Sequence, residues 1–225
     1  MEQKEVTMLL GVQVRKNAIP QKFIDTFIDI YNRNEKSGDG MRKVVTNCVE
    51  DPEFLKPIKE AIGSKNVLLN SSNFYQTDEN NLYWPHTDYH KSTNSEIENP
   101  ANVNVNVPLK YEGDEIPHLV IFNQRYLKFS VTWCLDDPVY EFTYNKGVPG
   151  RPYDYDITNK TEKEIDEQLY NEHLSKHGPA RNFYGLSGKA YALDPGSFIA
   201  FDNKRIHCTS NKAGPKLGLN LTFNT

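Results

Sequence analysis

One segment of strict two-residue periodicity constrains the fold of this 225-residue chain more than any other feature. Within the segment from Ala101 to Leu109, asparagine and valine alternate without interruption from Asn102 to Val107. Successive side chains of a β-strand point to opposite faces, so this pattern predicts a strand with its valines in a core and its asparagines on a polar face.

Further apolar runs, separated by proline and glycine, extend the β pattern through the second half of the chain. They predict strands at 67–69, 73–75, 119–122, 129–135, 197–201 and 217–223, after an N-terminal strand at 6–14. Many short strands with such turns are typical of a β-sandwich or barrel. The chain is therefore predicted to be mainly β, with flanking helices.

Two helices are predicted before this region. The first starts at Pro20, carries Phe23, Phe27, Ile30 and Tyr31 on one face, and ends before a loop at 37–40. The second begins with Asp51 as N-cap and Pro52 in its first turn, and stops at Gly63.

The length of the chain predicts one domain over residues 1–225. Residues 1–66 supply the N-terminal strand and supporting helices, and residues 67–225 form the β core. Within that core, we interpret residues 136–190 as an insertion that contains one helix, since Thr161 to Glu164 reads as a capping box.

Composition excludes several classes of protein. The formal charge of −4 argues against a dominant nucleic-acid interface. Three cysteines without a CxxC spacing exclude a disulfide framework and a cysteine zinc site, and favour a reducing, cytoplasmic location. No apolar run approaches the roughly 18 residues of a membrane span, and the first residues lack the apolar stretch of a signal peptide. The oligomeric state stays open.

Four residues in the β region carry metal or anion chemistry. His86 and Asp88 are two positions apart, so on a strand they point to the same side. His207 follows an apolar strand that a Pro-Gly turn introduces, and Lys216 precedes the last strand. Each of these features alone is too common in proteins to indicate a metal site. Together, two histidines and one carboxylate make the facial triad of non-haem Fe(II) oxygenases, which leaves three metal positions open.

With this set of residues, the sequence resembles the Fe(II)/2-oxoglutarate-dependent dioxygenase superfamily over residues 67–225, and in its lysine the prolyl 4-hydroxylase-like branch. The resemblance implies a double-stranded β-helix, or jelly-roll. It implies catalytic Fe(II) held by His86, Asp88 and His207, with 2-oxoglutarate and O2 as co-substrates. Lys216 and Tyr75 would contact the 2-oxoglutarate.

The reaction that the resemblance implies is oxidation of an unactivated C–H bond in a small molecule, an amino acid or a peptide side chain. Halogenase relatives replace the carboxylate of the triad with a small residue, so the retained Asp88 favours hydroxylation. The sequence does not identify the substrate.

The chain departs from the pattern at two places. Many members carry Arg-x-Ser where this chain has Lys216-Leu217-Gly218, and the missing hydroxyl leaves one co-substrate contact unassigned. His86 and His207 are also 121 positions apart, a long separation that the insertion at 136–190 would explain.

Alternatives remain open at several positions. Lys212 could replace Lys216 as the co-substrate cation, and His90 or His118 could be metal ligands. Asn104 and Asn106 could line the cavity or face solvent. Candidates for binding a substrate carboxylate are Arg125, Arg181 and Arg205, and the aromatic residues Tyr140, Phe142, Tyr144, Tyr153 and Tyr155 could form a lid or a surface covering.

Two other functions compete with an oxygenase. One is a non-catalytic, cupin-like jelly-roll that binds a metal or ligand. The other is a nucleic-acid demethylase of the same superfamily, against which stand the isoelectric point of 5.9 and the single cation after the distal histidine, where that branch has two arginines.

Overall fold

The computed structural model describes residues 11–33, 39–78, 83, 102–125, 132–133, 140–143, 154–155, 167–176, 188–203, 205–212 and 214–225. Its helical elements are α1 (Gln21–Asn32), α2 (Asp39–Glu50), α3 (Pro52–Ile62), α4 (Glu167–Leu169) and the π-helical turn η2 (Tyr170–Leu174). Its strands are β1 (Gln13–Arg15), β2 (Leu68–Thr77), β3 (Asn102–Tyr111), β4 (His118–Arg125), β5 (Thr132–Trp133), β6 (Tyr140–Thr143), β7 (Asp154–Tyr155), β8 (Gly188–Ala192), β9 (Phe198–Asp202), β10 (Arg205–Thr209) and β11 (Lys216–Asn224).

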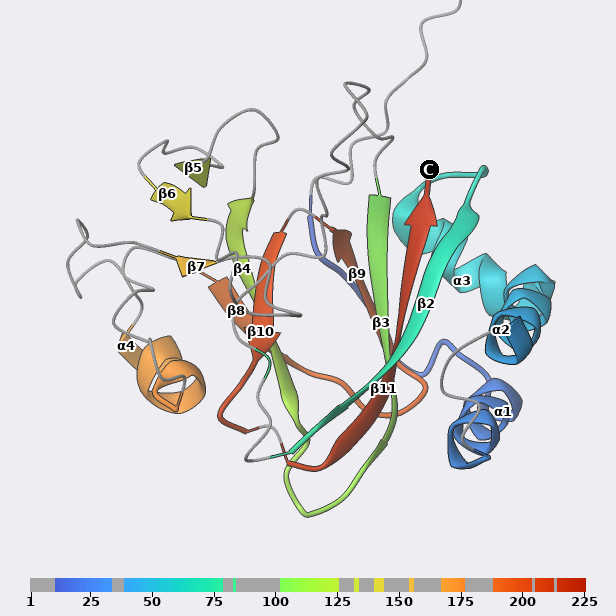
Figure 1. The fold of residues 1–225 in the computed structure, drawn as a ribbon, viewed down its shortest axis with the longest axis horizontal. Helices are drawn as coiled ribbons and strands as arrows, with labels where there is room; N and C mark the ends of the chain where they lie inside the picture. Colours follow the sequence, from blue (N-terminus) through green and yellow to red (C-terminus); the bar gives the residue numbers. More distant parts are fainter. Residues whose placement is uncertain are drawn as a thin grey trace, which may run out of the picture.

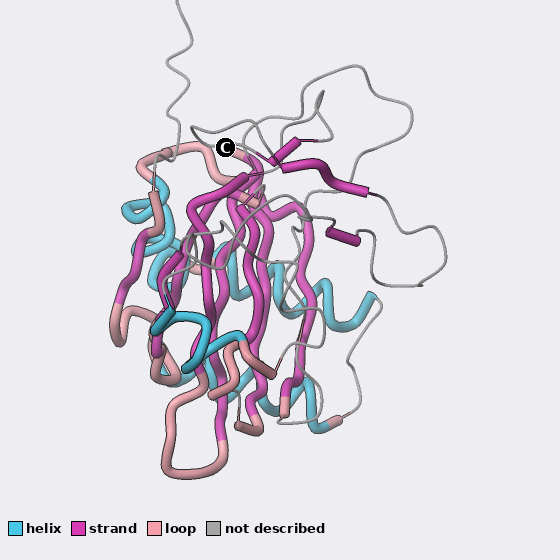
Figure 2. Tube along the Cα trace, turned by 90° about the vertical axis from the view of Figure 1, so that its left-hand side faces the viewer, coloured by secondary structure: helices cyan, strands magenta, loops and turns pink. Residues whose placement is uncertain are grey.

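Two antiparallel sheets face each other across the interior of the jelly-roll (Figure 1). The larger has five strands in the order β1-β9-β3-β11-β2, and the smaller has three in the order β10-β4-β8. Strands that are neighbours in space are mostly distant in the sequence, as in a jelly-roll, so the fold predicted from the sequence is confirmed. Figure 1 shows α1, α2 and α3 packed on the outer side of the larger sheet. Figure 2, turned by 90°, shows the strands running side by side.

The helices at the N-terminal end follow local signals with one exception. The Asp51 side chain accepts a hydrogen bond from the Glu53 backbone N–H at 2.8 Å, and Gly63 ends α3 in the left-handed region at φ 74°. The loop predicted at 37–40 was wrong at Asp39 and Gly40, and the helix that begins there was not predicted; residues 37 and 38 lie outside the described residues. Helix α2 starts within that supposed loop, at Asp39, because the buried Val45, Cys48 and Val49 give the segment an apolar stripe.

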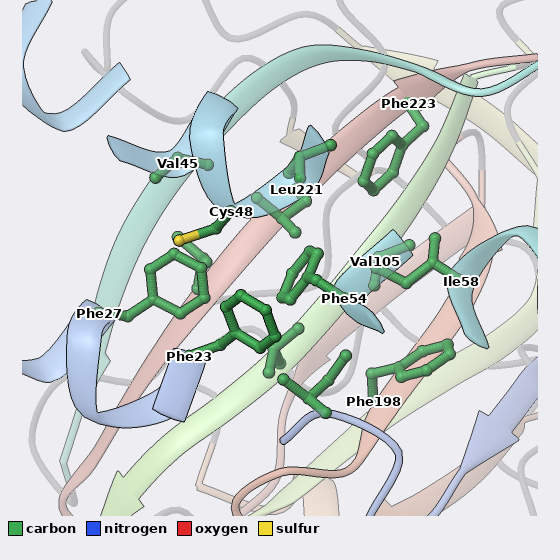
Figure 3. Close-up of a cluster of buried hydrophobic side chains, with 14 of the residues drawn as sticks. Phe23, Phe27, Val45, Cys48, Phe54, Ile58, Val105, Phe198, Leu221 and Phe223 are labelled. Atoms are coloured by element: carbon green, nitrogen blue, oxygen red, sulfur yellow. The ribbon is translucent and has the colours of Figure 1, made fainter. Parts of the chain in front are cut away.

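The main hydrophobic core lies between these helices and the outer face of the larger sheet. The valines of β3 are at most 1% exposed and meet aromatic side chains of α1 and α3. Figure 3 shows Phe27 and Phe54 facing Val105 and Leu221 of the sheet. Burial of each such side chain contributes about 1.5–3 kcal/mol to the stability of the folded state. This energy determines that the valine face of β3 points outward, toward the helices.

The opposite face of β3 is also buried, because it lies between the two sheets. Asn104 is fully buried, and its Oδ1 accepts a hydrogen bond from Thr222 Oγ1 at 3.1 Å. A smaller apolar cluster that includes Ile121, Ile199 and Phe201 fills another part of this interior. Asn104 and Asn106 therefore line the inside of the jelly-roll, and do not face solvent.

Several predictions lie partly outside the described residues. Of the N-terminal strand predicted at 6–14, the structure describes β1, which pairs with β9. The predicted capping box at 161–164 lies outside, and helical structure begins at Glu167. The domain boundaries and the insertion at 136–190 stay predictions. No helix in the described part of the chain is both long and apolar enough to cross a membrane.

Candidate active site

A cavity of about 210 Å³ lies between the two sheets. Its wall combines strands β2, β3 and β11 of the larger sheet with β4 and β10 of the smaller one. The polar side chains that line it include Tyr75, Asn106, His207, Lys216 and Asn220. Three of the residues singled out from the sequence as site residues, Tyr75, His207 and Lys216, thus meet in one cavity.

His207 lies on β10, where an irregularity in the pairing with β4 separates it from Arg205. The side chain is 7% exposed and packs edge-on against Phe201, with ring centroids 4.9 Å apart. Its Nδ1 lies 3.1 Å from the backbone oxygen of Arg205. When Nδ1 carries the proton and donates it to this carbonyl, the acceptor lone pair is on Nε2. A carbonyl partner on the second nitrogen is the arrangement typical of metal-binding histidines.

Lys216 is the first residue of β11, between Thr77 of β2 and Tyr111 of β3. It is 5% exposed, and burial lowers its pKa to about 8. Among the described residues, no carboxylate pairs with its Nζ. A buried ammonium group without a counter-charge is costly, and an anion in the cavity would relieve that cost.

The ring of Tyr75 lies beside Lys216, with the lysine Nζ 5.3 Å from the ring centroid. Its hydroxyl donates a hydrogen bond to Asn106 Oδ1 at 2.6 Å. Burial raises the pKa of Tyr75, so the phenol keeps its proton at physiological pH.

Gly218 pairs directly with Tyr75 across β11 and β2. A Cβ atom added at Gly218 would overlap the Cζ and Oη atoms of the tyrosine. This explains the departure from Arg-x-Ser. A side-chain hydroxyl at position 218 has no room, because the ring and hydroxyl of Tyr75 occupy that volume.

A backbone contact connects the segment before His86 to this wall of the cavity. The backbone oxygen of Tyr83 accepts hydrogen bonds from the N–H and the Oγ1 of Thr209, both at 3.2 Å. His86 and Asp88 themselves lie outside the described residues. Within the described ranges, no group of three or more His, Cys, Asp or Glu side chains is placed to hold a metal ion.

Apart from the asparagines, the alternative candidates whose side chains the structure describes are not among the residues that line the cavity. Lys212 is half-buried in the turn after β10, where its backbone oxygen accepts from the His118 N–H at 3.1 Å. The ring of His118 packs against that of His173, with centroids 5.1 Å apart. Arg205 donates to the backbone oxygens of Phe122 and Asn123. Arg125, Tyr140, Phe142 and Tyr155 are described only as positions in strands, and the remaining candidates fall outside the described residues: His90, Arg181, Tyr144 and Tyr153.

Sequence reasoning missed several residues of the cavity wall. Asn220 and Asn73 lie opposite each other on β11 and β2, and Asn220 also pairs with Asn106 of β3. The alternation of leucine with polar residues in the last strand could have indicated Asn220 as an inward position. Tyr83 carried no comparable signal.

No protein-family model matches the chain, and no curated protein matches its sequence. Among solved structures, HygX from Streptomyces hygroscopicus has a TM-score of 0.53 at 12% identity, covering 99% of this chain and 86% of that one. The chain has the fold of the 2-oxoglutarate-dependent, non-haem iron oxygenases. One structure of HygX contains nickel and 2-oxoglutarate.

Two other proteins with this oxygenase fold come from nogalamycin biosynthesis. The epimerase SnoN has a TM-score of 0.52 at 12% identity, over 95% of this chain and 78% of that one. The carbocyclase SnoK has a TM-score of 0.51 at 9% identity, over 99% and 84%. Both are described as non-haem and α-ketoglutarate-dependent. Their different reactions show that the oxygenase fold does not by itself define the reaction.

Proposed function

We propose that this protein is an Fe(II)- and 2-oxoglutarate-dependent dioxygenase that hydroxylates an unactivated C–H bond of a small molecule, an amino acid or a peptide side chain. One observation carries the proposal. A buried lysine without a described carboxylate partner shares a cavity with a buried histidine held through its Nδ1, inside a jelly-roll of the oxygenase type.

Lys216 and Tyr75 form the co-substrate end of the proposed site. The ammonium group of Lys216 would pair with the far carboxylate of 2-oxoglutarate, and the Tyr75 hydroxyl would donate a second hydrogen bond to it. Hydrogen bonds between charged groups are the strong ones in a protein interior. A dicarboxylate bound in this way would supply Lys216 with a counter-charge and would leave its 2-oxo acid end free.

His207 would be one of three iron ligands, with His86 and Asp88 as the others. Tyr83 is bonded to Thr209, two positions after His207, and His86 follows Tyr83 by three residues. This contact beside His207 supports the proposal that His86, nearby in the sequence, binds the same metal ion. When bound, the iron would supply O2 activation coupled to decarboxylation of 2-oxoglutarate.

The other residues of the cavity would hold and shield the reactants. Phe201 packs against the His207 ring and restricts its rotation. Leu119 and Phe74 add apolar surface to the wall, which helps to exclude water from the reaction. The substrate itself is proposed to be a small or peptidyl molecule, and not a nucleic acid, because the chain carries a net negative charge.

A non-catalytic jelly-roll that binds a ligand is the competing function. Such a protein has no need of a buried cation facing the same cavity as the histidine. Turnover separates the two functions. The wild-type protein, given Fe(II), O2 and 2-oxoglutarate, should form succinate and add one oxygen atom to a member of a small-molecule and peptide panel, as read by mass spectrometry. Absence of succinate formation with and without every panel member would contradict the proposal.

A further inference from the structure

The hydrogen bond between Tyr75 and Asn106 has a direction, and that direction bears on ligand binding. A phenol carries a single proton. In the structure the Tyr75 hydroxyl donates that proton to Asn106 Oδ1 at 2.6 Å. While it does so, Tyr75 presents only lone pairs to anything else in the cavity. A carboxylate placed beside Lys216 would then meet an oxygen lone pair and not a donor.

Asn106 is able to resolve this conflict because a carboxamide has both an acceptor and a donor end. Rotation of its terminal amide presents Nδ2 in place of Oδ1, so Asn106 donates to the tyrosine oxygen and the tyrosine proton turns elsewhere. Both arrangements keep one hydrogen bond between the two side chains, and neither requires the backbone to move. Asn106 is 7% exposed and lines the cavity.

The direction of the Tyr75 proton can change while the ring stays in place. Gly218 provides the volume in which the ring lies, and a side chain there would collide with it. Burial of Tyr75 raises its pKa, so loss of the proton is not an alternative way to satisfy an incoming anion.

We propose that Asn106 is a positioning residue that sets the direction of the Tyr75 hydroxyl proton and, by rotating its amide, turns that proton toward the far carboxylate of bound 2-oxoglutarate. This inference rests on the proposed function and deepens it. No bond breaks: the proton stays on the tyrosine oxygen, and the two partners exchange donor and acceptor roles.

Substitution by aspartate tests the proposal because an ionised carboxylate accepts hydrogen bonds and cannot donate them. The measurement is calorimetric titration of 2-oxoglutarate into the full chain, loaded with Fe(II) without oxygen. Asn106→Asp holds the Tyr75 proton and should weaken binding by about 10- to 100-fold, the factor that corresponds to loss of a hydrogen bond to a charged group. Asn106→Ala frees the proton but no longer directs it, so it should weaken binding clearly less than Asn106→Asp does.

Two controls separate the tyrosine proton from the added charge. Asn104→Asp adds the same charge at the neighbouring inward position of β3, where the partner is Thr222, and should change the affinity by about threefold or less. In a Tyr75→Phe background, Asn106→Asp should have little further effect, since there is no proton to hold.

Three results would overturn the inference: equal losses in Asn106→Asp and Asn104→Asp, a full loss that persists in the Tyr75→Phe background, or an Asn106→Ala variant as weak as Asn106→Asp. They leave the proposed function intact as long as Lys216→Ala abolishes 2-oxoglutarate binding. If the wild-type protein does not bind 2-oxoglutarate, or Lys216→Ala binds it normally, the proposed function and this inference both fail.

Discussion

Gly218 and Tyr75 lie directly opposite each other on β11 and β2, and the tyrosine fills the space that a side chain at position 218 would need. Many proteins with the related motif place a serine hydroxyl at this position. Here the hydroxyl of an aromatic residue from the neighbouring strand lies in that volume, and it is fixed by Asn106.

This relationship predicts that introducing a serine at position 218 weakens the binding of 2-oxoglutarate. Gly218→Ser should weaken 2-oxoglutarate binding by about tenfold or more, because overpacking a buried site costs about 1–3 kcal/mol and displaces the Tyr75 ring. Gly214→Ser is the matched control, since the nearest atom to a Cβ there is a backbone oxygen at 3.5 Å. Calorimetric affinities for the two variants check this, and binding by Gly218→Ser as tight as that of the wild type would show that the ring moves without cost.

The lowered pKa of Lys216, about 8, predicts how binding depends on pH. The proposed site binds 2-oxoglutarate through the ammonium form. Below pH 8 the lysine is charged and the affinity should be constant, and above pH 8 it should fall, approaching tenfold for each pH unit. Binding near pH 9 should also take up a proton, measurable by calorimetry in buffers of different ionisation enthalpy. Lys216→Arg should abolish the proton uptake. An affinity that stays flat from pH 7 to about 10 would contradict this assignment.

The same shift has a consequence for the stability of the ligand-free protein. Burial lowers the folded-state pKa of Lys216 below the ordinary value of 10.5, so the unfolded state binds more protons between about pH 8 and 10.5. The contribution of this group to the free energy of unfolding should therefore rise with pH across that window. Denaturant unfolding of the wild type and of Lys216→Met over that range isolates the contribution, and identical pH profiles for the two proteins would refute it.

His207 is proposed as an iron ligand, so His207→Ala should lower the affinity for Fe(II) by about 100-fold or more and abolish turnover. His118→Ala is the matched control, because His118 lies on the adjacent strand β4 but packs against His173. Metal affinity can be measured with Co(II) by its visible absorption. Unchanged Co(II) binding by His207→Ala would remove His207 from the metal site.

Asp88→Gly tests the carboxylate ligand of the proposed site. It should open a coordination position and lose hydroxylation, because the carboxylate is one of three protein ligands. The measurement is the yield of oxygenated product for each molecule of succinate formed. Normal hydroxylation by this variant would show that Asp88 is not a ligand.

The features predicted correctly from the sequence depend on local patterns. The valine–asparagine alternation fixes a strand whose two faces differ, and the Asp51 and Gly63 signals fix the ends of α3. The local pattern gave the wrong prediction at the start of α2, because Asp39 and Gly40 are typical of a loop. That segment is helical because its apolar side chains, among them Val45 and Val49, are buried against the rest of the protein.

What the sequence could not provide is the register between distant strands. The asparagine face was expected either to line a cavity or to face solvent, and the choice depends on the second sheet that covers it. The overlap of Gly218 with Tyr75 likewise arises only when β11 pairs with β2 in one specific register. A single-residue slip would turn every side chain of the strand to the other face.

Binding of 2-oxoglutarate to the iron-loaded chain is the measurement that tests the central claim most directly. The wild-type protein should bind one equivalent. Lys216→Ala should weaken that binding by about 100-fold or more, because breaking a buried ion pair from one side costs about 3–5 kcal/mol. Lys212→Ala, in the turn outside the cavity, should bind as the wild type does. No binding by the wild type, or a large loss in Lys212→Ala with none in Lys216→Ala, would contradict the account.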